Sequence, residues 1–369
     1  MSQLKKIMMT LGGSFLLVAC NTVDDEEMTD ITGDASDDND RTESVVEVEE
    51  TVMAENLQSP WTIVKDESRF FIPKREGTIY RIDENEEITE ETVQLNEEVI
   101  QEAESGLLGM VLDPDFTSNG YAYAYHSYEG AGTAIENRIV RLEWNEAEDE
   151  WTENAVLLDG IPGAPTHNGG RLAIGPDGYL YATTGDAEEV DLAQDQESLA
   201  GSILRMELDG AIPEDNPFDG SLVYSYGHRN PQGLTWLQDG TMYSSEHGAS
   251  GHDELNVIEA GNNYGWPVIE GDEEEEGMET PIIHSGQDTW APSGITTDED
   301  VIYTAGLRGE AVYLFNPEEP TEWTEYVSDY GRVRDVMIEG NDLYFITNNT
   351  DGRGNPESED DRLIHMELN

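Results

Sequence analysis

The 369 residues of this chain are enough to bury a large core, and a hydrophobic fraction of 37% is typical of a globular protein rather than a disordered one. The 81 acidic residues outnumber the 18 basic ones and give a formal net charge of -63. This charge excludes nucleic acid as a partner because phosphate would be repelled. Since the acids are spread along the whole chain, they favour a surface adapted to high salt over one built for a dedicated cationic partner.

Residues 1–20 have the pattern of a bacterial export signal. Lys5 and Lys6 precede an apolar run over residues 7–19, which is too short to span a membrane as a helix. The segment ends in Leu-Val-Ala-Cys and resembles a lipobox, in which the cysteine becomes the first mature residue and carries lipid. We therefore expect an exported protein with a lipid anchor at Cys20 on the outer face of the cell membrane, or a periplasmic or extracellular protein if it is released. In the alternative, the signal is an ordinary one and the cysteine is incidental.

Residues 21–55 are predicted to form a disordered tether. They are strongly acidic, contain one basic residue (Arg41) and have no aromatic residue. Such a segment cannot bury a core and is extended by its own charge. We expect it to hold the folded domain, residues 56–369, away from the membrane surface.

A short pattern recurs six times in the remaining chain. A turn containing Gly, Asp or Asn precedes a strand of apolar and aromatic residues, and the gaps leave room for further strands such as 138–142 and 202–206. The copies lie at residues 68–71, 119–123, 177–181, 239–243, 300–303 and 341–344. Four strands in each of six repeats predict an all-β fold, a six-bladed β-propeller. A β-sandwich or a β-helix is the alternative, but sandwich strands recur without this longer period.

The segment 224–254 combines a plain strand pair with two unusual ends. The strands meet at the turn Asp239-Gly240, and the sequences Gly-His-Arg-Asn-Pro-Gln-Gly (227–233) and Glu-His-Gly-Ala (246–249) lie outside them. Both ends can lie at the same end of one hairpin. Glycine and proline there fix an irregular backbone and allow close approach, so we interpret this region as the floor of a cofactor site.

A histidine and an aspartate are the first catalytic candidates. His167 lies in a glycine-rich loop before the third repeat, where it can serve as a general base near neutral pH. Asp186 follows the strand of that repeat, and one hairpin can place it beside His167 to orient the ring. The alternative is a surface loop histidine and a turn aspartate.

Arginines are the second signal, because residues 160–340 contain no lysine and few arginines. Arg205 falls on a predicted strand and can be structural. Those in loops or at strand ends beside the repeats are Arg229, Arg308, Arg332 and Arg334. Four guanidinium groups around one cavity would bind a ligand with several carboxylates, although surface ion pairs with the many acids remain the alternative.

Oxygen ligands and one tryptophan complete the set of candidates. The carbonyls of Gly248 and Ala249, and the oxygens of Asp253, Glu254 and Tyr264, are the kind of ligand that calcium takes. Trp290 precedes an Ala-Pro turn and can stack on a sugar ring or a flat cofactor, with plain core packing as the alternative.

Taken in order, these segments resemble the soluble pyrroloquinoline quinone (PQQ)-dependent aldose and glucose dehydrogenases, the glucose/sorbosone dehydrogenase family. The resemblance covers about residues 57–366 and is closer to the aldose sugar dehydrogenases of bacterial envelopes than to the larger glucose enzymes. The segments that carry it are GLLG (106–109), HNGGRLAIGPDGYLYATTGD (167–186), GHRNPQGL (227–234), SEHG with DELN (245–256), NNYGWP (262–267), WAPSG (290–294), GLRG (306–309) and GRVRDV (331–336).

The resemblance implies a role for each candidate. His167 is similar to the catalytic base, Asp186 to the carboxylate that orients it, and Arg229 to the arginine at the reactive quinone carbonyl. Positions implied to contact PQQ are Glu104, Arg229, Asn230, Gly248, Arg308, Arg332 and Arg334. Glu104 stands where glutamine is common and Arg308 where some relatives have lysine. A carboxylate at residue 104 would face an acidic cofactor, which is a departure from the family pattern.

The same resemblance implies calcium as a second cofactor. The carbonyls of Gly248 and Ala249 match those that hold the calcium bound to PQQ, and Glu254 and Tyr264 match a second calcium site in near relatives. Many relatives have proline at residue 249, so this loop is expected to be less rigid here. Trp290 is the candidate for contact with the substrate.

The implied reaction is oxidation of an aldose at its anomeric carbon to a lactone. His167 would take the hydroxyl proton, the hydride would pass to PQQ, and the electrons would go to an external acceptor. One alternative is a calcium-dependent lactonase-type hydrolase on a six-bladed propeller, which needs carboxylates around one central calcium and no arginine cluster. The other is a binding propeller at the cell surface without catalytic activity.

Overall fold

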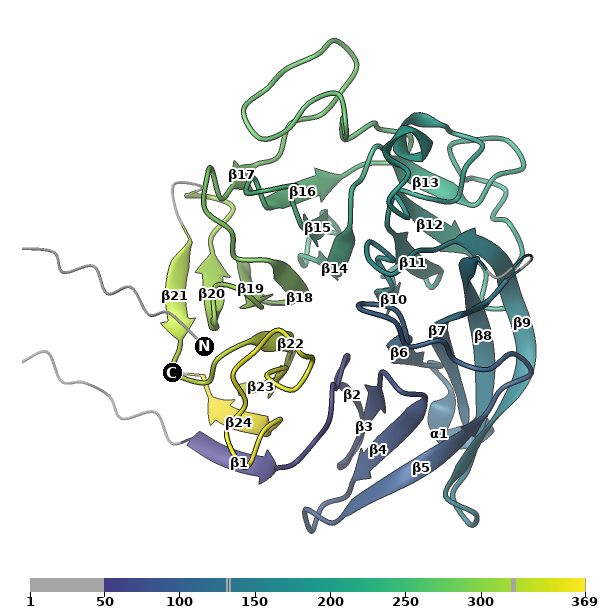
Figure 1. Ribbon diagram of the computed structural model, residues 1–369, viewed down its shortest axis with the longest axis vertical. Helices are drawn as coiled ribbons and strands as arrows, with labels where there is room; N and C mark the ends of the chain where they lie inside the picture. Colours follow the sequence, from purple (N-terminus) through teal and green to yellow (C-terminus); the bar gives the residue numbers. More distant parts are fainter. Residues whose placement is uncertain (1–49, 131, 133, 320–322, 369) are drawn as a thin grey trace, which may run out of the picture. The chain divides into compact units, whose positions relative to one another are not determined.

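The computed structural model describes residues 50–130, 132, 134–319 and 323–368, and nearly all regular structure in them is β-strand. The strands form four four-stranded sheets and one eight-stranded sheet, which surround a common centre in Figure 1. The strands nearest to this centre are β2 (Val64–Asp66), β6 (Leu107–Leu112), β10 (Leu172–Ile174), β14 (Pro231–Trp236), β18 (Pro292–Asp298) and β22 (Val333–Glu339). The all-β prediction is confirmed, and the radial arrangement is that of a β-propeller rather than of a sandwich or a β-helix.

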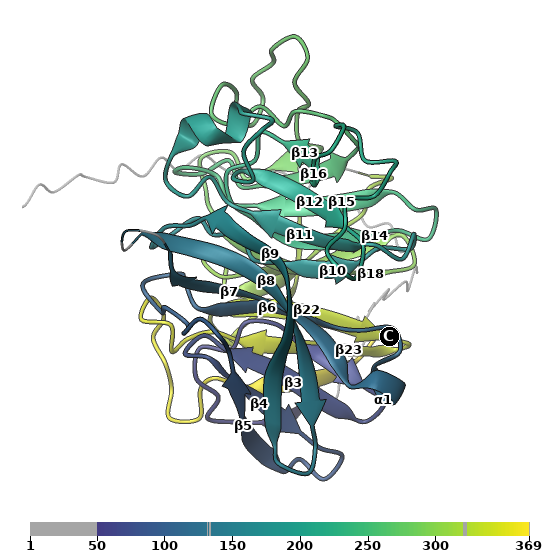
Figure 2. The same cartoon turned by 90° about the vertical axis from the view of Figure 1, so that its right-hand side faces the viewer.

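The eight-stranded sheet consists of two antiparallel groups joined by one parallel pair. The first group contains β2 (Val64–Asp66), β3 (Arg69–Lys74), β4 (Thr78–Ile82) and β5 (Ile88–Gln94). The second contains β6, β7 (Tyr121–Glu129), β8 (Ile135–Asn145) and β9 (Glu150–Pro162). Strands β5 and β9 pair in parallel with Thr92 opposite Glu150. Figure 2 shows the long strands β8 and β9 side by side in the second group.

Three of the other sheets follow chain order with antiparallel neighbours. They are β10 with β11 (Leu180–Thr184), β12 (Ser202–Met206) and β13 (Val223–Tyr226); β14 with β15 (Met242–Glu246), β16 (Glu254–Ile258) and β17 (Ile283–His284); and β18 with β19 (Val301–Gly306), β20 (Ala311–Phe315) and β21 (Thr324–Val327). Short helical segments include α1 (Phe116–Asn119) and the 3-10 segment η2 (Val190–Gln194).

The last sheet joins both ends of the described chain. Its order is β1 (Glu50–Ala54), β24 (Leu363–Glu367), β23 (Asp342–Thr347) and β22. The predicted tether was too long, because its final residues form β1 instead. Ala54 is buried and Met53 packs against the same apolar cluster, so this segment completes a sheet that β22–β24 alone leave with an open edge. The predicted signal with Cys20, and residues 21–49 of the predicted tether, lie outside the described residues.

All six predicted repeats correspond to equivalent strands. Each copy overlaps or leads into the second strand of its group, namely β3, β7, β11, β15, β19 and β23. The turns form for local reasons. Asp239 Oδ1 accepts a hydrogen bond from the Thr241 backbone N–H at 2.8 Å, and Gly240 has a φ of 91°, which glycine adopts readily.

The core lies between the faces of neighbouring sheets. Tyr125 of β7 and Ile139 of β8 pack in one cluster with Leu180 of β11 and Leu204 of β12, and all four are fully buried. Such contacts fix each sheet against the next, so loops at one end of different sheets are held at defined positions. No helix among the described residues is long and apolar enough to cross a membrane.

Candidate functional site

A cavity of about 470 Å³ brings together most of the predicted site residues. They come from loops that precede the first strand of a group or follow its second strand. Because these strands are antiparallel, such loops meet at one end of the sheets. The predicted residues that line the cavity are Glu104, His167, Arg229, Asn230, Gly248, Ala249, Arg308 and Arg332.

His167 and Asp186 form the predicted pair. His167 Nδ1 lies 2.8 Å from Asp186 Oδ1, and the aspartate is fully buried while the histidine faces the cavity. The backbones of Gly185 and His167 lie in close contact here, since a Cβ on Gly185 would be 1.9 Å from the carbonyl oxygen of His167. Glycine is therefore required at residue 185. The carboxylate accepts the Nδ1–H and leaves the lone pair of Nε2 on the cavity side, as a base needs.

Arg229 contacts the other nitrogen of the same ring. Its Nη2 lies 3.0 Å from His167 Nε2, and its Nη1 donates to the His247 carbonyl at 3.1 Å. The backbone N–H of Arg229 donates to Glu246 Oε2 at 2.8 Å, which ties the start of β14 to the end of β15. Both ends of the segment 224–254 thus meet beside the cavity, as the sequence predicted.

Trp266 is a site residue that sequence reasoning did not identify. Its Nε1–H donates to Asp186 Oδ2 at 2.8 Å, so both carboxylate oxygens of Asp186 are used. The Arg229 guanidinium carbon lies 5.3 Å from the centre of the Trp266 ring. Trp266 therefore supports the orienting carboxylate and the cavity arginine together. Its place in the NNYGWP segment was the signal, but that segment does not show where the indole N–H points.

Asn230 links two loops of the site. Its side-chain Oδ1 accepts a hydrogen bond from the Gly169 backbone N–H at 3.0 Å, and the residue also lines the cavity. The loop that carries His167 is therefore attached to the start of β14. Asn230 fixes the distance between the histidine and Arg229, in addition to any contact with a ligand.

Three of the four predicted arginines line the cavity, and the fourth does not. Arg334 is buried, and its Nη1 donates to Gln232 Oε1 at 2.9 Å. Burial, together with the nearby Arg332 charge, lowers the pKa of Arg334 to about 9. Arg334 is thus not among the residues that line the cavity, and its contact with a cofactor stays a prediction.

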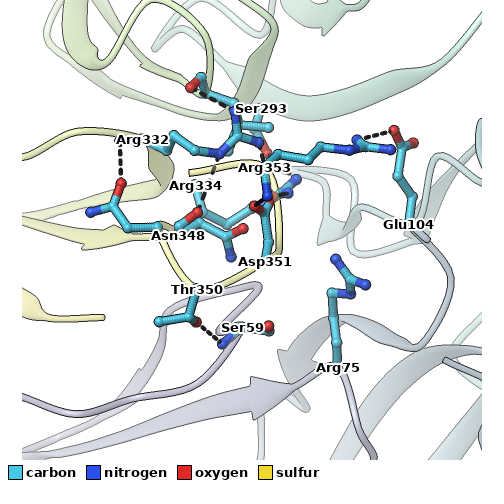
Figure 3. A network of polar contacts seen from close by, with 12 residues as sticks. Ser59, Arg75, Glu104, Ser293, Arg332, Arg334, Asn348, Thr350, Asp351 and Arg353 are labelled. Carbon is cyan, nitrogen blue, oxygen red and sulfur yellow. Dashed lines mark hydrogen bonds and ion pairs between the residues drawn. The ribbon is translucent and has the colours of Figure 1, made fainter. Parts of the chain in front are cut away.

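Arg332 and Arg334 share a buried acid that sequence reasoning missed. Asp351 Oδ2 lies 2.9 Å from Arg332 Nη2 and 4.0 Å from Arg334 Nη2 (Figure 3). The alternative interpretation, in which the arginines form ion pairs with acids, therefore holds for some of them. Arg205 is an example, because it forms ion pairs with Asp177 and Asp215. Arg308 differs, because it is exposed and forms no ion pair with the described residues.

Glu104 is at the cavity, but its charge is paired. Its Oε1 lies 2.5 Å from Arg353 Nη1, and Figure 3 shows the two side chains reaching toward each other. Arg353 also lines the cavity and was not among the predicted residues. Nothing in the local sequence Asp-Gly-Arg-Gly (351–354) connects it to residue 104.

Trp290 does not line the cavity. Its ring centre lies 4.9 Å from that of Trp323 and 6.1 Å from that of Tyr313, so it belongs to an aromatic cluster. These contacts support the packing alternative, and the stacking of Trp290 on a substrate stays a prediction. Its neighbours Thr289 and Ala291 line the cavity instead.

The loop after β15 provides oxygen ligands of the predicted kind. A Cβ on Gly248 would lie 1.9 Å from the carbonyl oxygen of Gly251 and 2.5 Å from that of His252, so backbone oxygens crowd this glycine. Asp253 anchors the loop, since it accepts the backbone N–H groups of Gly248 and Ala291 at 3.0 and 2.8 Å. Carbonyl-rich loops of this kind suit calcium.

Glu254 and Tyr264 border a separate cavity of about 10 Å³, which is room for about one ion or water. Burial and the neighbouring charge of Glu246 raise the pKa of Glu254 to about 8. The Tyr264 hydroxyl donates to the Val257 carbonyl at 2.7 Å, so only its backbone carbonyl is left for a metal.

No group of three or more His, Cys, Asp or Glu side chains in the described part of the chain has the arrangement of a metal site. Any calcium must therefore rely on backbone oxygens as well.

The donor set of the main cavity fits a ligand with several carboxylates. Arg229, Arg308 and Arg332 line it, while Glu104 is neutralised by Arg353. Arg229 Nε and His247 Nε2 are buried without a hydrogen-bond partner among the described residues, and buried polar atoms of this kind require one. Burial lowers the pKa of His247 to about 4, so its ring is neutral near pH 7. The cavity therefore offers unused hydrogen-bonding groups in a cationic setting.

Comparison with known proteins places this geometry in a family. Residues 57–356 match the family model of glucose/sorbosone dehydrogenases. Among curated proteins, the chain is 33% identical over 257 residues to quinoprotein glucose dehydrogenase B of Acinetobacter calcoaceticus, and this match covers 61% of the chain and 54% of that protein. It is 31% identical to aldose sugar dehydrogenase YliI of Escherichia coli, over 68% of the chain and 76% of that protein. The chain thus spans little more than half the length of the first of these relatives.

A solved structure resembles the fold closely. It is the PQQ-bound form of an aldose sugar dehydrogenase from Streptomyces coelicolor, with 38% identity and a TM-score of 0.81. The alignment covers 87% of this chain and 98% of that one. Since the family model covers most of the chain, the chain belongs to the glucose/sorbosone dehydrogenase family.

Proposed function

We propose that this protein is a PQQ- and calcium-dependent aldose sugar dehydrogenase that oxidises the anomeric carbon of its substrate to a lactone. The observation that carries the proposal is the chain of contacts Trp266–Asp186–His167–Arg229 on the wall of a cavity lined by arginines. This chain of contacts places the basic Nε2 of His167 and the guanidinium of Arg229 at the same cavity. The family membership and the PQQ-bound relative from Streptomyces coelicolor support the choice of cofactor.

The cavity arginines would hold the cofactor. Arg229, Arg308 and Arg332 offer forked donors for carboxylates, and Asn230 and Gly248 offer polar groups beside them. PQQ, when bound, supplies the two-electron redox chemistry by accepting the hydride and passing electrons to an external acceptor. Arg334 would act from the second layer, through Gln232 and the shared Asp351.

His167 would remove the proton from the anomeric hydroxyl of the sugar. In the neutral ring, Asp186 accepts the Nδ1–H and the lone pair lies on Nε2, which can then act as the base. The imidazolium that forms is stabilised by the buried carboxylate of Asp186, which the Trp266 N–H holds in place. Arg229 must leave Nε2 for this step, and its guanidinium is then free to stabilise negative charge in the cavity.

Calcium would occupy the loop after β15 through the carbonyls of Gly248 and Ala249, beside the cofactor. A second ion at Glu254 and the Tyr264 carbonyl would neutralise a buried carboxylate. Ala249 lies where a rigid proline is common in relatives, so we expect the first site to depend more on Asp253, which anchors the loop.

We extend the proposal to architecture and location. The eight-stranded sheet counts as two blades joined at β5 and β9, which gives six blades in all. The export signal over residues 1–20, a lipid anchor at Cys20 and the acidic segment 21–49 would place the enzyme outside the cell membrane. The net charge of -63 supports a salt-rich setting.

One assay separates this proposal from its rivals. Calcium-loaded apoprotein is mixed with PQQ and glucose, and reduction of an artificial dye is followed at saturating calcium. We expect dye reduction that depends on PQQ and falls by roughly 10²–10⁴ in His167→Gln, because the base is lost. Lactone hydrolysis without dye reduction would instead support the hydrolase, and neither activity would support a binding protein.

A further inference from the structure

Glu104 places a permanent negative charge on the wall of the cavity. Its side chain is 17% exposed, and its Oε2 accepts the backbone N–H of His167 at 3.3 Å. Burial alone would raise the pKa of Glu104, but the neighbouring His247 and Arg353, together with the hydrogen bonds from Arg353 and from the His167 backbone, outweigh burial and lower it to about 2. An ionised carboxylate there would repel a ligand with several carboxylates, so its charge needs a partner.

Arg353 supplies that partner from a distant part of the chain. Its Nη1 lies 2.5 Å from Glu104 Oε1, although the two residues are 249 positions apart. The Arg353 backbone N–H donates to Asp351 Oδ1 at 2.8 Å, and this aspartate also binds Arg332. The ion pair therefore joins the loop beside His167 to the loop beside Arg332, across the cavity that both line (Figure 3).

The neighbouring charges cannot replace Arg353. Arg75 is buried and donates to the Ala103 carbonyl, so it supports the loop rather than the Glu104 carboxylate. The His247 ring forms no hydrogen bond or ion pair with Glu104, and its Nε2 has no hydrogen-bond partner among the described residues. Among the described residues, Arg353 is the cation that lies within ion-pair distance of the Glu104 carboxylate.

We propose that Arg353 is a positioning residue that neutralises Glu104 and holds it on the His167 loop, so that a cavity containing a carboxylate can accept an anionic cofactor. This inference rests on the proposed function, because it takes PQQ as the anion. Arg353 acts through Glu104 and need not contact the cofactor.

The test is a cycle of variants in which PQQ binding is measured rather than turnover. Dissociation constants for PQQ are obtained from quenching of tryptophan fluorescence in calcium-loaded apoprotein, for wild type, Arg353→Gln, Glu104→Gln and the double variant. We expect Arg353→Gln to weaken binding about tenfold at low salt, and the double variant to bind within roughly threefold of wild type. The loss in Arg353→Gln should shrink at about 1 M salt, where the Debye length is ~3 Å.

Two controls separate this role from general charge or structural effects. Arg69→Gln removes a half-buried arginine that also forms ion pairs, with Asp66 and Glu146, but does not line the cavity, so its PQQ affinity should not change. Arg353→Lys keeps the charge and should retain most of the affinity. Thermal melting confirms that each variant is folded.

Each other outcome overturns the inference. A double variant as weak as Arg353→Gln would mean that Arg353 binds the cofactor directly or supports the fold, and unchanged binding in Arg353→Gln would mean that Glu104 needs no partner. Wild-type protein that does not bind PQQ at all would overturn the proposed function together with this inference. Wild-type binding with a failed cycle would overturn this inference alone.

Discussion

Arg229 Nη2 donates to His167 Nε2 across 3.0 Å, so a cation covers the nitrogen that must act as the base. With Asp186 2.8 Å from the opposite nitrogen, the ring is held in one tautomer from both sides. A ligand that attracts the Arg229 guanidinium would expose Nε2. His167 would then be able to act as the base only when this ligand is bound.

Replacing Asp186 with asparagine should lower kcat by roughly 10²–10⁴, since the amide can donate to Nδ1 and favour the wrong tautomer. Affinity for PQQ should stay within a few-fold of wild type, because Asp186 is fully buried and does not line the cavity. Dye-reduction kinetics at saturating PQQ and calcium measure the effect. Asp177→Asn, in the turn before the same strand, is the matched control, and equal losses in both variants would contradict the orienting role.

Trp266→Phe should lower kcat about tenfold while leaving the structure intact. The change removes the N–H that holds Asp186 Oδ2 but keeps an aromatic ring beside Arg229, and a hydrogen bond to a charged group is worth ~1.5–3 kcal/mol. Combined with Asp186→Asn, the two losses should be less than multiplicative, because both act through one carboxylate. Trp323→Phe, in the aromatic cluster of Trp290, serves as the control. Fully multiplicative losses would show that Trp266 acts independently of Asp186.

Calcium should stabilise the protein, and Glu254 should carry part of that effect. Free calcium at 100 times its dissociation constant is expected to add about 2.7 kcal/mol to the free energy of unfolding for each site. Glu254→Gln should reduce the calcium-induced rise in Tm, measured by calorimetry with and without a chelator. Glu275→Gln, in the exposed acidic loop, should leave the rise unchanged. If both variants respond to calcium like wild type, Glu254 is not a ligand.

His126 should make stability depend on pH below neutrality. The residue is fully buried on β7, and burial lowers its pKa from 6.5 to about 4. Since the unfolded chain then binds more protons than the folded one, this contribution is fully present above pH 6.5 and is lost as pH falls toward 4. Urea titrations of wild type and His126→Gln between pH 5 and 7 should show a shallower slope in the variant. Parallel slopes would indicate that the pKa of His126 is the same in the folded and the unfolded chain.

The sequence predicted the features that depend on local pattern. The six turn-and-strand repeats all fall at equivalent strands, because Asp-Gly turns and apolar alternation are local signals. The His167–Asp186 pair was also predictable, since both residues flank one hairpin-length segment.

Features set by side-chain direction or by distant pairing were not predictable. Trp266 and Trp290 have similar sequence contexts, yet one binds Asp186 and the other joins an aromatic cluster. Arg334 is two residues from Arg332, and strand alternation alone would put both on one face, yet Arg332 lines the cavity while Arg334 is buried against Gln232. Arg353 meets Glu104 only through the closed arrangement of sheets.

The pairing of β1 with β24 has a consequence for how this protein is made. Three strands of the final sheet come from the carboxyl-terminal part of the chain, and the fourth comes from residues 50–54. The ring therefore cannot close until residues 363–367 have been synthesised, and until then β1 has no partner strand in this sheet. Loss of β24 would leave the edges of β1 and β23 free and would promote aggregation, although no residue that lines the cavity would be missing.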